Sequence, residues 1–146
     1  MARQLSRFGV DLKGKILSSE SLGTQIAMFI LRVLFGGLIM YHGCRKILAF
    51  DEVYPWFPDP IGLGSSVSFV VVVAIEILFG LCIAVGFLTR LAVIPVLFTM
   101  AVAFFIAYSR FQFMDREVSF AYLLLSGVVF LAGSGRYSAD RLYFKR

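Results

Sequence analysis

The sequence contains few of the residues that build metal centres and common catalytic sites. It has one histidine, His42, and two cysteines, Cys44 and Cys82, which fall at opposite ends of two apolar segments. A structural zinc site needs four ligands, usually cysteine and histidine, so we predict no metal site and no covalently bound cofactor. Phosphate-binding loops, nucleophile elbows and zinc motifs are also missing. A soluble enzyme of a familiar catalytic type is therefore excluded.

Charged residues are scarce as well. They make up 16% of the 146 residues, whereas hydrophobic residues make up 60% and the mean hydropathy is +0.88. Soluble domains contain about 25% charged and 45–50% apolar residues. The composition is typical of a membrane protein, and the length suits one compact helical bundle.

Four apolar segments are long enough to cross a bilayer as helices, which takes about 20 residues each. They span roughly residues 22–43, 66–87, 91–109 and 113–133. We therefore predict an all-α membrane protein with a four-transmembrane-helix bundle over residues 22–135. A basic C-terminal tail, residues 136–146, follows the bundle.

The segment before the bundle, residues 1–21, is basic and carries apolar residues at helical spacing. This pattern is typical of a helix lying on the membrane surface, although a frayed tail is an equal alternative. No cleavable signal peptide is recognisable, so the first apolar helix should remain as an anchor.

Lysine and arginine are distributed unevenly around the four segments. Nine lie in the two tails and the second loop, and four lie in the first and third loops. The positive-inside rule then places both termini in the cytoplasm. Contact with anionic lipid accounts for the net charge of +5, so we expect no nucleic acid as a partner.

Two ions of opposite charge lie within the apolar segments. Arg32 and Glu76 each stand eleventh in a predicted 22-residue helix, so we predict an ion pair between them near the bilayer midplane. Gly36 and Gly80 lie one turn from these ions and would let the two helices approach closely. The pair either fixes the helix register or provides a proton-accepting or ligand-holding group, because intramembrane ions often have functions.

A second group of polar residues is expected at the outer boundary of the bundle. His42 belongs there and not beside the ion pair, and Lys46, Tyr108 and Glu117 fall at the same depth. Histidine titrates near neutral pH, so this group is our candidate for acid–base or headgroup chemistry. The alternative is an interfacial histidine that only forms hydrogen bonds. The proline-rich loop over residues 50–64 is either an interfacial anchor or a lid over an outward-facing pocket.

Five pieces of sequence follow one another along the chain: LRVLFGGLIMYHGCRKI, FPDPIGLG, IEILFGLCIAVGFLTRLA, Glu117 and GSGRYSADRL. In their order and spacing they resemble the DoxX family of small bacterial and archaeal membrane proteins, over about residues 28–142. The motif residues of the family fall on the following positions of this sequence: Arg32, His42, Lys46, Glu76 and Asp140.

The resemblance implies a multi-pass protein of the bacterial or archaeal inner membrane. It also implies a subunit or accessory of a quinone-linked membrane oxidoreductase, such as thiosulfate:quinone oxidoreductase, or of a redox-defence assembly. Quinone would then be the expected ligand, and a partner redox protein would carry the electrons because this chain has no evident redox centre of its own. The quinone would occupy an apolar slot with Glu76, Arg32 or His42 at its end.

Two other functions are compatible with the sequence. One is a non-enzymatic scaffold or assembly factor for a redox partner, in which Arg32 and Glu76 only lock the bundle. The other is a small transporter, which would need internal repeats, but the last two apolar segments contain no counterpart of Arg32 or Glu76. Four helices bury little surface, so we also expect a homodimer.

Overall fold

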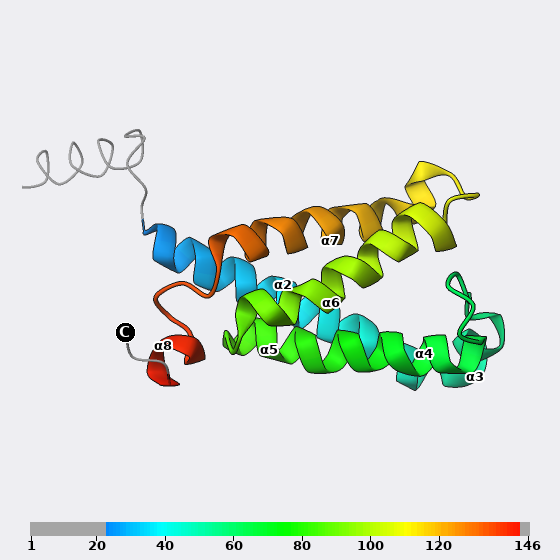
Figure 1. Cartoon of the computed structure of the whole chain (residues 1–146), viewed down its shortest axis with the longest axis horizontal. Helices are drawn as coiled ribbons and strands as arrows, with labels where there is room; N and C mark the ends of the chain where they lie inside the picture. Colours follow the sequence, from blue (N-terminus) through cyan, green and yellow to red (C-terminus); the bar gives the residue numbers. More distant parts are fainter. Residues whose placement is uncertain (1–22, 144–146) are drawn as a thin grey trace, which may run out of the picture.

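The computed structural model describes residues 23–143, and every regular element in this range is helical. The all-α class is thereby confirmed. The predicted surface segment, residues 1–21, lies outside the described residues. The helices form an elongated bundle with α3 (Phe50–Val53) at one end and α8 (Ala139–Tyr143) at the other (Figure 1).

Three helices are long and apolar enough to cross a membrane. The first is α2 (Thr24–Leu48). The second runs over Ser65–Val85 as α4 (Ser65–Ala74), the π-helical η2 (Ile75–Phe79) and α5 (Gly80–Val85). The third runs over Thr89–Ala107 as α6 (Thr89–Val102) and the π-helical η3 (Ala103–Ala107).

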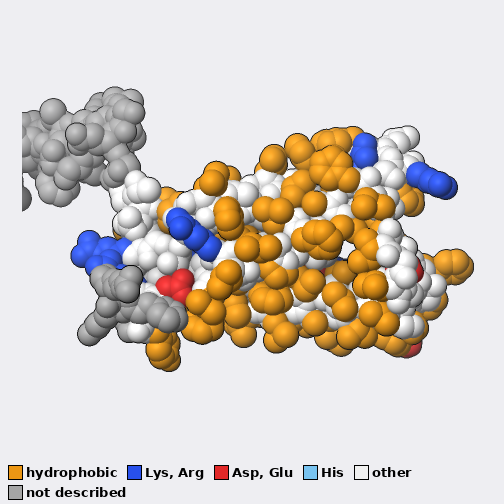
Figure 2. Space-filling model, viewed as in Figure 1, with side chains coloured by type: hydrophobic (Ala, Val, Ile, Leu, Met, Phe, Trp, Pro, Cys, Tyr) orange, Lys and Arg blue, Asp and Glu red, His pale blue; other side chains and the backbone are white. Residues whose placement is uncertain are grey.

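A fourth long helix, α7 (Phe113–Ala132), lies beside α6. Its first turns carry Asp115, Arg116 and Glu117, so the apolar part is shorter than that of the other three helices. Hydrophobic side chains cover the visible flank of the bundle, and lysine and arginine gather near its two ends (Figure 2). A lipid bilayer is the environment that matches this surface.

Helix α2 continues to Leu48, five residues beyond the predicted end of the first segment. The extra residues include Arg45 and Lys46, which lie in the last turn. Cations are favourable there because the carbonyl end of a helix carries a partial negative charge. The extension places His42 and Lys46 on the same continuous helix, one turn apart.

Helix α2 packs along the Ser65–Val85 helix, and two glycines set the distance. A Cβ on Gly36 would lie 2.5 Å from both Ala84 N and Gly80 O, so only glycine allows this contact. The close approach predicted from Gly36 and Gly80 is therefore confirmed. Buried apolar side chains of α2, α5, α6 and α7 form the core next to this contact, including Phe35, Ile39, Ile83, Val93, Val96 and Val129.

The bundle carries two π-helical segments, η2 and η3. A π-helical turn widens the hydrogen-bonding pattern by one residue and often occurs at functional sites. Glu76 belongs to η2, whereas Ala103 and Ala107 begin and end η3. All three residues line the same internal cavity.

Candidate functional site

A cavity of about 340 Å³ lies between four long helices: α2, Ser65–Val85, Thr89–Ala107 and α7. The loop that follows η1 (Tyr54–Trp56) also lines it. Its walls are mostly apolar, with side chains such as Val72, Ile75, Phe98 and Met100. A small number of polar side chains interrupt this surface. Four of the six candidate residues from the sequence line the cavity: His42, Lys46, Glu76 and Tyr108.

Glu76 pairs with Lys46 on the cavity wall. The Lys46 Nζ donates to both carboxylate oxygens of Glu76 at 2.5 Å. The Glu76 side chain is only 3% exposed, whereas that of Lys46 is 24% exposed. The ion pair thus has one deeply buried member and one that is partly exposed.

The predicted ion pair between Arg32 and Glu76 is wrong. Glu76 lies opposite Gly43, close to the end of α2 that carries Lys46, and a Cβ on Gly43 would lie 3.0 Å from Glu76 Cβ. Arg32 lies more than two turns further back along α2. The predicted helix ends were wrong, so the predicted depths of Arg32 and Glu76 in the bundle were wrong as well. The same error separated Glu76 from His42, since both residues line one cavity.

Arg32 instead holds the segment that follows α7. Its guanidinium donates to the backbone carbonyls of Ser134 and Tyr137, and the second bond is 2.5 Å long. Gly86 allows this arrangement, because a Cβ there would lie 2.6 Å from Arg32 Cζ. The Arg32 side chain is 1% exposed and does not line the cavity.

His42 forms a hydrogen bond with Tyr122 of α7. Its Nε2 lies 3.1 Å from the Tyr122 hydroxyl, and the two rings meet edge to face with centroids 5.4 Å apart. The bond joins the first and last long helices across the cavity. Sequence reasoning missed Tyr122, because the mostly apolar stretch around it also carries Ser119 and Ser126 and nothing in the sequence singles out its hydroxyl.

Tyr108 lines the cavity from the turn after η3, and Asp115 and Ser119 line it from α7. Burial of the phenol and the negative charge of Glu76 raise the pKa of Tyr108 above its usual value. Tyr108 therefore keeps its proton and remains a hydrogen-bond donor at neutral pH. Glu117 is exposed and does not line the cavity, so the structure does not join it to the predicted group.

The loop between η1 and α4 covers the cavity with Phe57, Pro58, Pro60, Ile61 and Leu63. Asp59 orders this loop by accepting hydrogen bonds from the backbone N–H groups of Leu63 and Gly64 and from the hydroxyl of Ser68. The bond from Gly64 is the main reason that the pKa of Asp59 is below its usual value. The position of the loop agrees with the predicted lid, while exposed Trp56 beside it suits the predicted interfacial anchor.

The cavity therefore combines an apolar volume with donors and one buried carboxylate. His42, Tyr122, Lys46 and Tyr108 can donate hydrogen bonds, and Glu76 can accept a proton. No cluster of three histidine, cysteine, aspartate or glutamate residues suited to a metal ion occurs in residues 23–143. The arrangement suits a neutral ligand with an apolar body and polar acceptor atoms.

Comparison with known proteins finds one family and two relatives. The DoxX family model matches residues 27–109. An uncharacterized membrane protein of Mycobacterium tuberculosis is 28% identical over 131 residues, which cover 80% of each chain. The Bacillus subtilis protein named "Putative oxidoreductase CatD" is 30% identical over 123 residues, which cover 83% of this chain and 90% of the relative. No solved structure matches the chain.

Proposed function

Because the chain belongs to the DoxX family of membrane proteins, we propose that it is a subunit of a quinone-linked membrane oxidoreductase. The observation that carries the proposal is the convergence of His42, Tyr122, Lys46 and Glu76 on one apolar cavity. The oxidoreductase name of the Bacillus subtilis relative supports the same class.

The cavity fits the headgroup of a quinone in volume and in chemistry. Ligand pockets for small molecules measure about 300–1,000 Å³ and combine apolar walls with a few polar groups. The volume of about 340 Å³ suits a single ring system. The apolar residues of α4 and α6 would contact the ring, and the polar residues at its margin would contact two carbonyl oxygens.

The polar residues of this chain have separate roles in the proposal. The pair of His42 and Tyr122 donates a hydrogen bond to one carbonyl, and Lys46 donates to the other. Glu76 holds the Lys46 ammonium in place and exchanges a proton with the ligand site. A bound quinone would supply the capacity to accept two electrons and two protons.

The electrons come from a partner redox protein in this proposal. The chain crosses the inner membrane of a bacterium or archaeon four times, with both termini in the cytoplasm. This orientation puts the cavity near the outer surface, below the loop of Asp59. A second copy of the chain packs on the phenylalanine-rich face of α6 or α7.

The test is quinone binding by the full chain purified in detergent. Tyr122→Phe removes one hydroxyl and keeps the ring, and Glu76→Gln removes the charge and keeps the shape. Cys44→Ser is the matched control, because Cys44 is exposed on α2 and does not line the cavity. Bound quinone is measured by mass spectrometry of extracted lipids and by titration with a short-chain quinone.

We expect the wild type and Cys44→Ser to bind quinone in a one-to-one ratio. Tyr122→Phe should bind quinone about tenfold more weakly, because it loses roughly one hydrogen bond to a buried acceptor. Absence of saturable quinone binding in the folded wild type would contradict the proposal. Purification with a redox partner but without quinone would then favour the scaffold function.

A further inference from the structure

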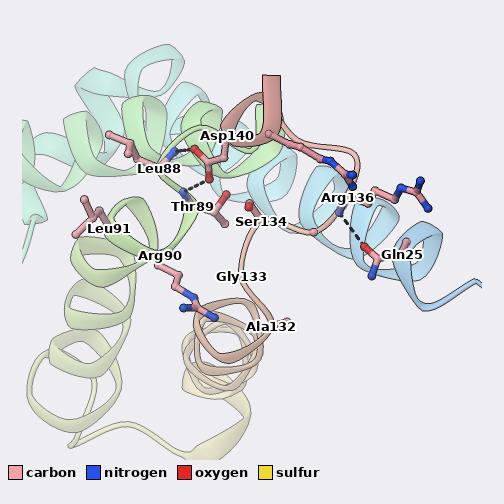
Figure 3. A pocket seen from close by; sticks show the side chains of 12 residues that line it. Gln25, Leu88, Thr89, Arg90, Leu91, Ala132, Gly133, Ser134, Arg136 and Asp140 are labelled. Carbon is pink, nitrogen blue, oxygen red and sulfur yellow. Dashed lines mark hydrogen bonds between the residues drawn. The ribbon is translucent and has the colours of Figure 1, made fainter. Parts of the chain in front are cut away.

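A second cavity, of about 950 Å³, lies at the opposite end of the bundle (Figure 3). It is formed by the start of α2, the turn between α5 and α6, and the segment from Ala132 to Arg141. Gln25 lines this cavity and His42 lines the first one, and both belong to α2. Seventeen residues of helix separate them, which corresponds to about 25 Å. The two cavities are therefore separate sites near opposite membrane boundaries.

The second cavity has an excess of positive charge. Arg90 lines it from the start of α6, and Arg136 and Arg141 line it from the segment after α7, whereas Asp140 is the one acidic residue on its described wall. None of the three arginines forms a salt bridge with a carboxylate within the described part of the chain. Arg90 has only a long 3.4 Å hydrogen bond to the carbonyl of Leu131. Three cations against one carboxylate on the same wall favour binding of an anion.

The carboxylate of Asp140 is already engaged. It accepts hydrogen bonds from the backbone N–H groups of Leu88 at 2.6 Å and Thr89 at 3.4 Å (Figure 3). The positive charge of Arg32 also acts on Asp140. Asp140 thus closes the turn before α6, and the described wall of the cavity carries three arginines against this one carboxylate.

Thr89 provides an independent sign of a missing partner. Its side chain is 1% exposed and lines the cavity, but its hydroxyl has no hydrogen-bond partner. A buried hydroxyl without a partner is costly and rare. Thr89 is also the first residue of α6, where its backbone N–H is already donated to Asp140, so only its hydroxyl is left without a partner in the described residues. The buried hydroxyl of Thr89 and the three exposed arginines line the same cavity.

We propose that the second cavity binds a phosphate group, carried by an anionic lipid headgroup or by a soluble phosphate ester. Arginine is suited to phosphate because its planar guanidinium donates two parallel hydrogen bonds. The hydroxyl of Thr89 donates a further bond from the cavity floor. Exposed Leu91 lines the cavity, and exposed Leu131 precedes Ala132 of its wall, so the two leucines provide an apolar path for the acyl chains of a lipid.

The experiment measures binding of dioleoylphosphatidylglycerol to the full chain in detergent, by native mass spectrometry. Dioleoylglycerol has the same acyl chains without the phosphate and serves as the control ligand. Glycerol 1-phosphate, added in competition, represents the soluble source. The test variants are Thr89→Val and the double variant R136Q/R141Q, and the control variant is Arg110→Gln, an exposed arginine at the other end of the bundle.

We expect saturable binding of the phospholipid and not of dioleoylglycerol. Each arginine near the headgroup should contribute about a fivefold change, so R136Q/R141Q should bind about 25-fold more weakly. Thr89→Val should bind severalfold more weakly without loss of thermal stability, because its hydroxyl has no partner to lose in the protein. Arg110→Gln should bind like the wild type.

Each further result is decisive. Displacement of the lipid by millimolar glycerol 1-phosphate supports the site and assigns a soluble ester, whereas retention of the lipid supports the site and assigns the lipid. Equal weakening in Arg110→Gln and R136Q/R141Q would overturn the proposal, because the attraction would then be diffuse. Equal binding of dioleoylglycerol and the phospholipid would also overturn it.

Discussion

Lys46 and Glu76 lie 30 positions apart on different helices, yet the Lys46 Nζ contacts both carboxylate oxygens of Glu76 at 2.5 Å. The pair joins the last turns of α2 to the π-helical segment η2. It also forms part of the wall of the smaller cavity. The two members are buried to different extents, and this asymmetry can be measured.

Replacement of Lys46 should cost more stability than replacement of Glu76. Lys46→Met leaves a nearly buried carboxylate without its partner, and we expect a loss of about 3 kcal/mol in the free energy of unfolding. In Glu76→Gln the remaining ammonium can turn toward water, so the expected loss is about 1 kcal/mol. Denaturant unfolding in detergent micelles measures both values. The double variant should be more stable than Lys46→Met alone, and additive losses would contradict the pairing.

The contact between α2 and α5 depends on Gly36. In Gly36→Ala the new methyl group would lie 2.5 Å from backbone atoms of Gly80 and Ala84. The helices must separate, and we expect a loss of about 2 to 3 kcal/mol, in the range of overpacked cores. Gly37→Ala is the matched control, because nothing lies within 4 Å of its Cβ position. Thermal unfolding of the two variants should differ clearly, and similar melting temperatures would contradict this contact.

Arg32 should hold the segment after α7 against the bundle. Arg32→Met removes the donors to the carbonyls of Ser134 and Tyr137 without leaving a buried charge. We expect amide hydrogen exchange over residues 133–140 to become at least tenfold faster, which corresponds to about 1.4 kcal/mol. Exposed Arg45→Gln, which removes the same charge elsewhere on α2, should leave this exchange unchanged. Unchanged exchange in Arg32→Met would show that other contacts suffice.

The loop over the smaller cavity should loosen in acid. The folded pKa of Asp59 is lowered below its ordinary value of 3.8, chiefly by the hydrogen bond from Gly64. The carboxylate therefore stabilises the loop fully above that value, and this contribution is lost as the pH falls through the lower folded pKa. Trp56 is the one tryptophan of the chain and lies beside the loop, so its fluorescence reports the change.

We expect a fluorescence transition below pH 3.8 in the wild type and its absence in Asp59→Asn. The variant should also show faster amide exchange at Leu63 and Gly64 at neutral pH, since an amide replaces the carboxylate that accepts their N–H groups. A transition of the same size in both proteins would assign the change to another group.

The sequence predicted the helical class and the glycine contact well, because hydropathy and small residues directly report burial and close packing. It predicted the partner of Glu76 badly. Two midplane ions looked complementary when the first helix was ended at residue 43, but α2 extends to Leu48 and brings Lys46 to Glu76. A boundary error of five residues changed the partner of a buried charge.

The partners of Arg32 could not be read from the sequence at all. They are backbone carbonyls of Ser134 and Tyr137, and every residue has a carbonyl. Tyr122 was missed for a different reason, because a single tyrosine in an apolar helix resembles ordinary packing. Only the fold shows that its hydroxyl meets His42.

The bond between Arg32 and the far segment also has a consequence for biosynthesis. The two acceptors are made 102 and 105 positions after Arg32. At roughly 5 to 20 residues per second, translation needs on the order of 5 to 20 seconds to cover this stretch. During that interval the first helix enters the membrane with a guanidinium that lacks these acceptors. A nascent chain that stops before Ser134 therefore leaves the guanidinium of Arg32 without either of these two acceptors.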